Sequence, residues 1–72
     1  MEYIPDKYDV ALLLWDEGEF LAININIGKD FSSLYRYNDN LYIIWYSKEN
    51  VLEKIDIVDA GTAKKMFKKF KG

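Results

Sequence analysis

The fold is decided by the stretch IDIVDAGTAKKMFKKF, residues 55–70, in which the hydrophobic period changes from two to nearly four. Before Asp59, apolar and charged residues alternate, as in a strand with one buried face. After it, apolar residues recur at helical spacing, at Ala63, Met66, Phe67 and Phe70. The stretch therefore predicts a strand that leads into a C-terminal helix, which either Asp59 or Thr62 can cap.

Runs rich in β-branched and aromatic residues precede this helix and predict strands. They are residues 10–15, 20–27, 34–37, 41–46 and 51–58, with a short helix over residues 50–55 as the alternative to the last run. Turn residues separate them, at Asp16–Glu19 with Gly18 at positive φ, at Gly28–Ser33 and at Asn38–Asn40. We therefore predict an α+β fold, a small antiparallel β-meander of four to five strands packed on one C-terminal α-helix. Residues 1–72 are expected to form a single domain.

Composition limits how such a small domain is stabilised. The chain has 72 residues, half of them apolar, and contains neither cysteine nor histidine. Disulfides and thiolate or imidazole metal sites are therefore excluded, although chains this short often depend on such additions. Association with a second copy is the remaining means of support, so we predict a homodimer.

The N-terminal residues and the lengths of the apolar runs predict the cellular location of the protein. The N-terminal residues show neither the basic region nor the apolar region of a secretory signal. The longest apolar runs, Val10–Trp15 and Leu41–Tyr46, are far shorter than the ~20 residues that span a bilayer. We expect a soluble cytoplasmic protein without a membrane span.

A tyrosine-rich surface is predicted on the second hairpin. If Asp39 and Asn40 form a two-residue loop, Tyr37 pairs with Tyr42 and the strands acquire two distinct faces. One face carries Tyr35, Tyr37, Tyr42, Ile44 and Tyr46. The other carries Leu34, Leu41, Ile43 and Trp45, interrupted by Arg36, and matches the apolar stripe of the helix. We expect the helix to cover this second face.

The tyrosine face would then be open, because one helix cannot cover both sides of a sheet. Tyrosine is favoured in protein interfaces, so we predict that this face binds another protein. The alternative is that these rings pack against one another and against Tyr3 and Tyr8. A change of register by one residue would exchange the two faces.

Charge is distributed unevenly along the chain. Residues 1–60 hold twelve acidic and five basic residues, hence −7, whereas residues 61–72 hold five lysines and no acid, hence +5. The lysines are Lys64, Lys65, Lys68, Lys69 and Lys71. They could bind nucleic acid or an anionic surface, but a solvated helix face is the usual reason for such a pattern, and the acidic body would repel a polyanion. A third use of the asymmetry is that Asp16, Glu17 and Glu19 meet a basic groove on another protein.

Catalytic and cofactor patterns are missing from the sequence. Without histidine or cysteine there is no imidazole base or thiol nucleophile, and Gly61–Lys64 lacks the second glycine of a phosphate-binding loop. The acidic residues of Asp16–Glu19 lack the spacing of a calcium loop. We therefore expect neither a metal nor a cofactor. The predicted function is a small non-enzymatic, homodimeric protein-interaction module that acts as an accessory or inhibitory protein; the alternative is a nucleic-acid or anionic-surface binder.

Overall fold

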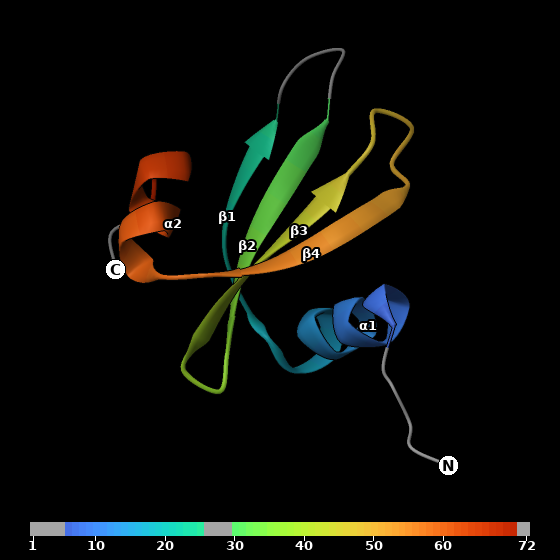
Figure 1. Cartoon of the computed structure of the whole chain (residues 1–72), viewed down its shortest axis with the longest axis horizontal. Helices are drawn as coiled ribbons and strands as arrows, with labels where there is room; N and C mark the ends of the chain where they lie inside the picture. Colours follow the sequence, from blue (N-terminus) through green and yellow to red (C-terminus); the bar gives the residue numbers. More distant parts are fainter. Residues whose placement is uncertain (1–5, 26–29, 71–72) are drawn as a thin grey trace.

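The structure is a computed structural model that describes residues 6–25 and 30–70. In this part of the chain it has two helices and a four-stranded antiparallel sheet (Figure 1). In chain order the elements are α1 (Lys7–Glu17), β1 (Glu19–Ile25), β2 (Phe31–Tyr37), β3 (Asn40–Tyr46), β4 (Leu52–Val58) and α2 (Ala60–Met66). The strands lie side by side in sequence order, β1-β2-β3-β4. The predicted α+β class, the antiparallel meander and the C-terminal helix are confirmed.

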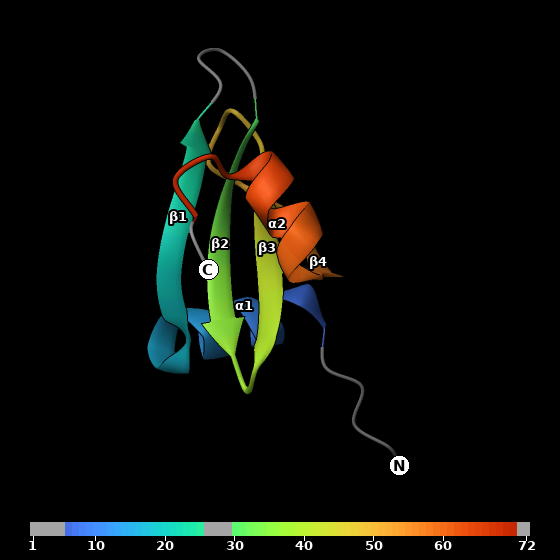
Figure 2. The ribbon, with the colours of Figure 1, turned by 90° about the vertical axis from the view of Figure 1, so that its left-hand side faces the viewer.

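The two helices lie on opposite faces of the sheet. In Figure 2, α2 lies in front of the strands, and α1 crosses behind them at the end that holds the β2–β3 turn. The molecule therefore has three layers, with α1 and α2 outside and the sheet between them (Figures 1 and 2). Each face has its own small hydrophobic cluster, because the central strands carry buried apolar residues on both sides.

The α2 side contains the core that the sequence predicts. Its buried residues are Ala22, Leu34, Ile43, Ala63, Phe67 and Phe70, with Leu41, Trp45 and Met66 packed against them. The helix begins after Asp59, whose Oδ1 accepts a hydrogen bond from the Thr62 N–H at 2.7 Å. The helix ends at Met66, earlier than its apolar spacing suggests. A turn follows, in which the Phe70 N–H donates to the Phe67 carbonyl, and it keeps both rings on the sheet.

The N-terminal hairpin predicted from residues 10–15 is wrong, because this segment forms the helix α1. Asp6 caps the helix: its side chain accepts from the Asp9 N–H, and the Asp9 side chain accepts from the Asp6 N–H. This capping box satisfies backbone donors that a helix start otherwise leaves unpaired. Ala11 and Leu14 then fall three residues apart on the buried face. Local capping and leucine's helix preference therefore outweigh the strand-like look of an unbroken apolar run.

Gly18 is needed for close packing at the end of α1, and its φ of −78° is not the positive value expected from the sequence. A Cβ atom built at this position would lie 2.5 Å from the backbone oxygen of Leu14. The chain passes directly from Gly18 into β1, so the glycine allows a helix and a strand to meet without a longer connection.

The β2–β3 turn differs from the expected one by one position. Its two loop residues are Asn38 and Asp39, both at positive φ (49° and 63°), and Tyr37 pairs with Asn40. Tyr35 consequently lies opposite Tyr42. Moving the loop by one position shifts each pairing by two residues, so every side chain keeps its predicted face.

Two other boundaries change. The predicted loop over residues 28–33 is too long, because Phe31–Ser33 already belong to β2 and pair with both β1 and β3. β4 begins at Leu52, and an irregularity at Glu53, opposite Trp45 and Tyr46, buries Leu52 in place of the predicted Val51. Residues 26 and 27, the predicted end of the strand that became β1, lie outside the described residues.

Candidate functional site: an aromatic groove between α1 and the sheet

The predicted tyrosine face is partly covered, because α1 packs on it. Ile44 is fully buried and packs with Leu14 and Leu52 beneath the helix. Tyr35, Tyr37, Tyr42 and Tyr46 are half-buried around this cluster. The prediction that the whole face is open is therefore wrong, and the reason is the unpredicted helix α1. Tyr3, with which these rings were alternatively expected to pack, lies outside the described residues.

One uncovered part of this face is an aromatic groove of about 580 Å³. One wall comes from α1, the floor from β1, β2 and β3, and the other wall from the connection between β3 and β4. The lining residues are Tyr8, Trp15, Phe20, Ile23, Phe31, Ser33, Tyr35, Tyr46, Asn50, Val51 and Leu52. We call this site the aromatic groove. It holds two of the five predicted interface residues, Tyr35 and Tyr46.

The rings of the aromatic groove hold one another in place. Tyr46 stacks on Phe31 at a centroid distance of 4.6 Å and on Trp15 at 6.4 Å, both with an interplanar angle of 13°. The Trp15 indole N–H also donates to the Tyr46 hydroxyl at 2.9 Å. Phe20 meets Tyr35 edge to face at 5.6 Å. Because these contacts link three strands and a helix, the walls are preorganised and little side-chain entropy remains to be lost on binding.

The polar groups of the aromatic groove are neutral. Burial raises the pKa of the Tyr35 hydroxyl above its usual value, and the neighbouring Tyr46 hydroxyl raises this pKa further. Tyr35 therefore keeps its proton at neutral pH and can act as a hydrogen-bond donor. None of the lining residues is acidic or basic. The aromatic groove thus offers apolar contact and a few hydrogen bonds.

Ser33 lies at the floor of the aromatic groove, between Ile23 of β1 and Ile44 of β3. The residue is 4% exposed, and its Oγ finds no hydrogen-bond partner among the described residues. A buried hydroxyl without a partner costs about 1 to 3 kcal/mol. Ser33 and Phe31 were not predicted to line a site, because both lie in the predicted loop over residues 28–33.

The helix α1 has a second apolar stripe beside its buried face. Tyr8, Leu12 and Trp15 follow helical spacing, and Leu12 is 60% exposed. Tyr8 and Trp15 line the aromatic groove, so the exposed stripe continues its wall. A helix that is apolar on several sides is usually buried by further contacts. The aromatic groove and this stripe of α1 therefore form one apolar surface that stays exposed in the isolated chain.

Three acidic residues lie at the junction between α1 and β1. Asp16 and Glu17 end α1, whereas Glu19 begins β1 opposite Arg36, on the face of the strand that points away from Phe20. The last turn of α1 carries no basic residue, and the carbonyl ends of the helix add negative potential there. Arg36 approaches Glu19 at 3.9 Å, but both side chains are largely exposed.

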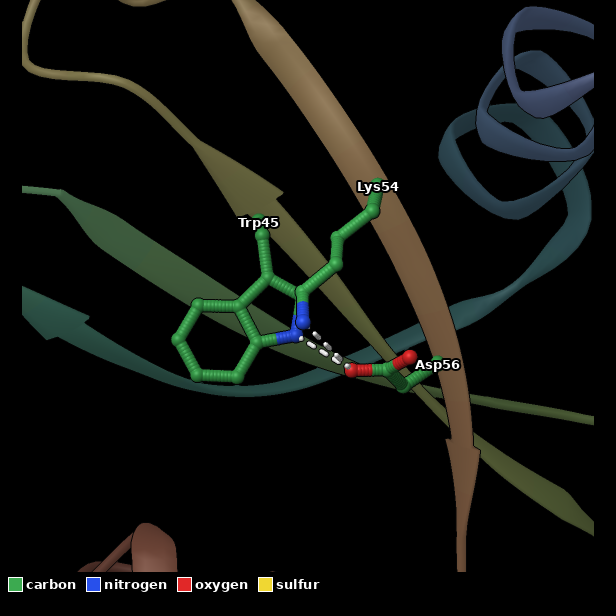
Figure 3. A network of polar contacts seen from close by, with 3 residues as sticks. All are labelled: Trp45, Lys54 and Asp56. Carbon is green, nitrogen blue, oxygen red and sulfur yellow. Dashed lines mark hydrogen bonds and ion pairs between the residues drawn. The ribbon is translucent and has the colours of Figure 1, made fainter.

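A polar cluster on the opposite face contrasts with the aromatic groove (Figure 3). The Trp45 indole N–H donates to Asp56 Oδ2 at 2.9 Å, and the Lys54 ammonium lies 3.7 Å from the same oxygen. Lys54 also lies 5.4 Å from the centre of the Trp45 ring. Each of the three side chains contacts the other two. The cluster therefore joins β3 to β4 and helps to hold the sheet together.

The predicted basic residues lie around α2. Lys64 and Lys65 are exposed on the helix, whereas Lys68 and Lys69 lie in the turn that follows it. Lys71 lies outside the described residues. Because the helix ends at Met66, the four described lysines do not form one continuous helix face. Lys68 and Lys69 line a hollow with Ala22, Ile23 and Asn24 of β1, on the α2 side of the sheet.

Comparisons with known proteins add no functional assignment. No protein-family model, no curated protein and no solved structure matches the chain. In the part of the chain that the structure describes, neither helix is long and apolar enough to cross a membrane. The function is therefore argued from the aromatic groove itself.

Proposed function

We propose that the chain is a small non-enzymatic protein-interaction module that works in the cytoplasm and binds a protein partner through the aromatic groove. The observation that carries this proposal is the hollow of about 580 Å³ whose aromatic walls are fixed by mutual stacking. Exposed, preorganised aromatic rings are typical anchors of protein interfaces. The exposed stripe of α1 extends the contact area beside them. Binding of such a surface to another protein's active or binding site would make the chain an accessory or inhibitory protein.

Site-specific photo-cross-linking in the native host tests this proposal. A photoreactive phenylalanine analogue at Phe20, which is 55% exposed in the aromatic groove, should give a discrete cross-linked protein. The same analogue at Ile57, an exposed residue on the far edge of the sheet, is the matched control and should give none. Equal labelling from both positions, or no product from Phe20, would contradict the proposal.

The homodimer expected from the sequence stays a prediction and has its own test. Sedimentation velocity over a wide range of micromolar concentrations should show a monomer–dimer equilibrium if two copies associate. A change of Phe20 to serine should shift this equilibrium toward monomer if the aromatic groove is the contact. A strict monomer at every concentration would remove the dimer and leave a different protein as the partner.

The lysines around α2 provide a second candidate function, the binding of nucleic acid or an anionic surface. Lys64, Lys65, Lys68 and Lys69 are all exposed on one side of the molecule. Charge reversal at Lys65 and Lys68 should abolish a salt-dependent mobility shift with nucleic acid if this surface binds it. Absence of any shift in dilute salt would dismiss this function.

A further inference from the structure

The apolar side chains exposed around the aromatic groove form one large patch. Three are aromatic and three aliphatic, each about half exposed: Tyr8, Trp15, Phe20, Leu12, Ile23 and Val51. A large aromatic side chain has about 150 to 250 Å² of surface, so the six together expose on the order of 500 Å². The largest apolar patch of a typical monomer covers about 300 to 600 Å² and is often a binding site. The patch is therefore large enough for a protein interface.

The area of the patch matches what a stable dimer needs. An interface of standard size buries about 800 Å² per partner, of which somewhat more than half is apolar. The patch supplies on the order of 500 Å² of apolar surface, which is the apolar part of one such half-interface. The chain also contains neither cysteine nor histidine, so association is the remaining support for its small core.

The patch combines a ridge with a hollow on the same face of the molecule. The helix α1 lies on the sheet, so its exposed side chains Tyr8, Leu12 and Trp15 stand above the floor of the aromatic groove. We call these three side chains the α1 ridge. In a two-fold dimer the same surface of both copies must be complementary to itself. A ridge beside a groove meets this condition, because a two-fold rotation places each ridge over the other groove.

The charges near the patch permit contact with a second copy. None of the residues that line the aromatic groove is acidic or basic, so no like charges meet inside such a contact. Asp9 and Asp16 lie about one turn from Leu12 along α1, where they would form the polar rim that interfaces usually have. The hollow on the α2 side differs, because Lys68 and Lys69 line it and would repel their counterparts in a second copy.

We propose that the partner of the aromatic groove is a second copy of the chain, in a two-fold dimer. The α1 ridge of each copy lies in the aromatic groove of the other, with Leu12 against the wall that contains Val51. The two α1 helices then lie side by side between the two sheets. This inference rests on the proposed function and names the partner.

One charge in the ridge and an opposite charge in the groove test this arrangement. Leu12→Lys and Val51→Glu change side chains that are 60% and 54% exposed, so both variants should fold, as circular dichroism checks. Sedimentation velocity of the purified full chain should show a monomer–dimer equilibrium. Each variant alone buries an unpaired charge in both contacts of the dimer and should weaken dimerisation at least about ten-fold.

Mixing the two variants should restore the dimer. In a mixed dimer the introduced lysine meets the introduced glutamate in one contact, and the other contact is that of the unchanged chain. Native mass spectrometry distinguishes this dimer from both homodimers by its mass. Ile57→Glu is the matched control, because it places the same charge at an isoleucine that is 69% exposed on β4, outside the aromatic groove. This control should leave dimerisation unchanged.

Three results would overturn the inference: a monomer at every concentration of the unchanged chain, equal effects of the Val51 and Ile57 variants, or no recovery of dimer on mixing. The Phe20 cross-link separates this inference from the proposed function. A cross-linked product of twice the mass of the chain supports both. If the purified chain is monomeric and Phe20 captures a different protein, the aromatic groove is still a protein-binding site and only the second copy is wrong.

Discussion

The two helices cover the two faces of the sheet to different extents, although the same four strands build both faces. On the α2 side the chain continues after the helix, and Phe67 and Phe70 extend the cover toward Leu34 and Ala22. On the α1 side only Gly18 separates the helix from β1. This connection is too short to cover the aromatic rings of the groove. The segment that follows each helix therefore decides whether that face of the sheet becomes a closed core or an open groove.

This difference also separates stability from binding. Side chains on the α2 side are buried against other parts of the same chain and contribute to folding. Phe20, Trp15 and Ile23 on the α1 side keep much of their apolar surface exposed. Changes on the α2 side should therefore alter the free energy of unfolding, whereas changes on the α1 side should alter binding.

Phe67→Ala should be the most damaging change. Phe67 is 1% exposed in the α2-side core, and removing its ring should lower the free energy of unfolding by about 3 to 5 kcal/mol. Phe20→Ala removes the same ring from the aromatic groove and should cost less than about 1 kcal/mol. Urea denaturation followed by circular dichroism measures both. Equal losses would contradict the contrast between the two faces.

Gly18→Ala tests the tight junction that leaves the aromatic groove open. The added methyl group would meet the Leu14 backbone oxygen at 2.5 Å, so we expect a loss of about 1 to 3 kcal/mol in the free energy of unfolding. Gly61→Ala in α2 is the control, because its nearest contact is a normal 3.5 Å to Asp59 Oδ1. This control should stabilise the protein by up to about 1 kcal/mol through helix propensity. The same sign for both variants would disprove the steric argument.

Ser33→Ala should stabilise the protein. The hydroxyl is buried at the floor of the aromatic groove without a partner among the described residues, and its removal should raise the free energy of unfolding by about 1 kcal/mol. Thermal and urea denaturation of the variant measure the change. A loss of stability would mean that the hydroxyl is satisfied in solution, and the floor of the aromatic groove would then be polar.

Acid should weaken the α2 side through Asp59. Hydrogen bonds from Thr62 lower the pKa of this carboxyl group below its usual value, and nearby Lys65 lowers this pKa further. A lowered pKa in the folded state stabilises the fold above the unfolded pKa of about 4, and this contribution is lost as the pH falls through the folded pKa. Asp59→Asn keeps a capping acceptor but removes the titration. Stability measured from neutral to acidic pH should therefore fall less steeply for the variant, and parallel curves would argue against this role.

The α2 side was predictable from the sequence, and the α1 side was not. The β-branched and aromatic runs of β1, β3 and β4 and the spacing of Ala63, Phe67 and Phe70 each point to one structure. The assignment of side chains to faces survived an error in the β2–β3 turn, because the true loop shifts the pairing by two residues. A shift by one would have exchanged the faces.

The missing helix explains why the aromatic groove was not predicted. Val10–Trp15 is apolar throughout, so it shows no period and does not distinguish a helix from a buried strand. The available signal was Asp6 followed by Asp9, a capping pair, together with the helix formers Ala11 to Leu14. Two of the predicted interface residues, Tyr35 and Tyr46, line the aromatic groove, but its remaining walls depend on α1 and on the true start of β2.

The placement of the two tryptophans has an optical consequence. Trp15 stands partly exposed beside Tyr46 at the wall of the aromatic groove, whereas Trp45 lies on the opposite face with its indole N–H held by Asp56. Each face of the sheet thus carries one intrinsic fluorophore, in a different environment. Unfolding should change the emission of both, because each loses its hydrogen-bond partner, whereas a ligand in the aromatic groove should change that of Trp15 alone.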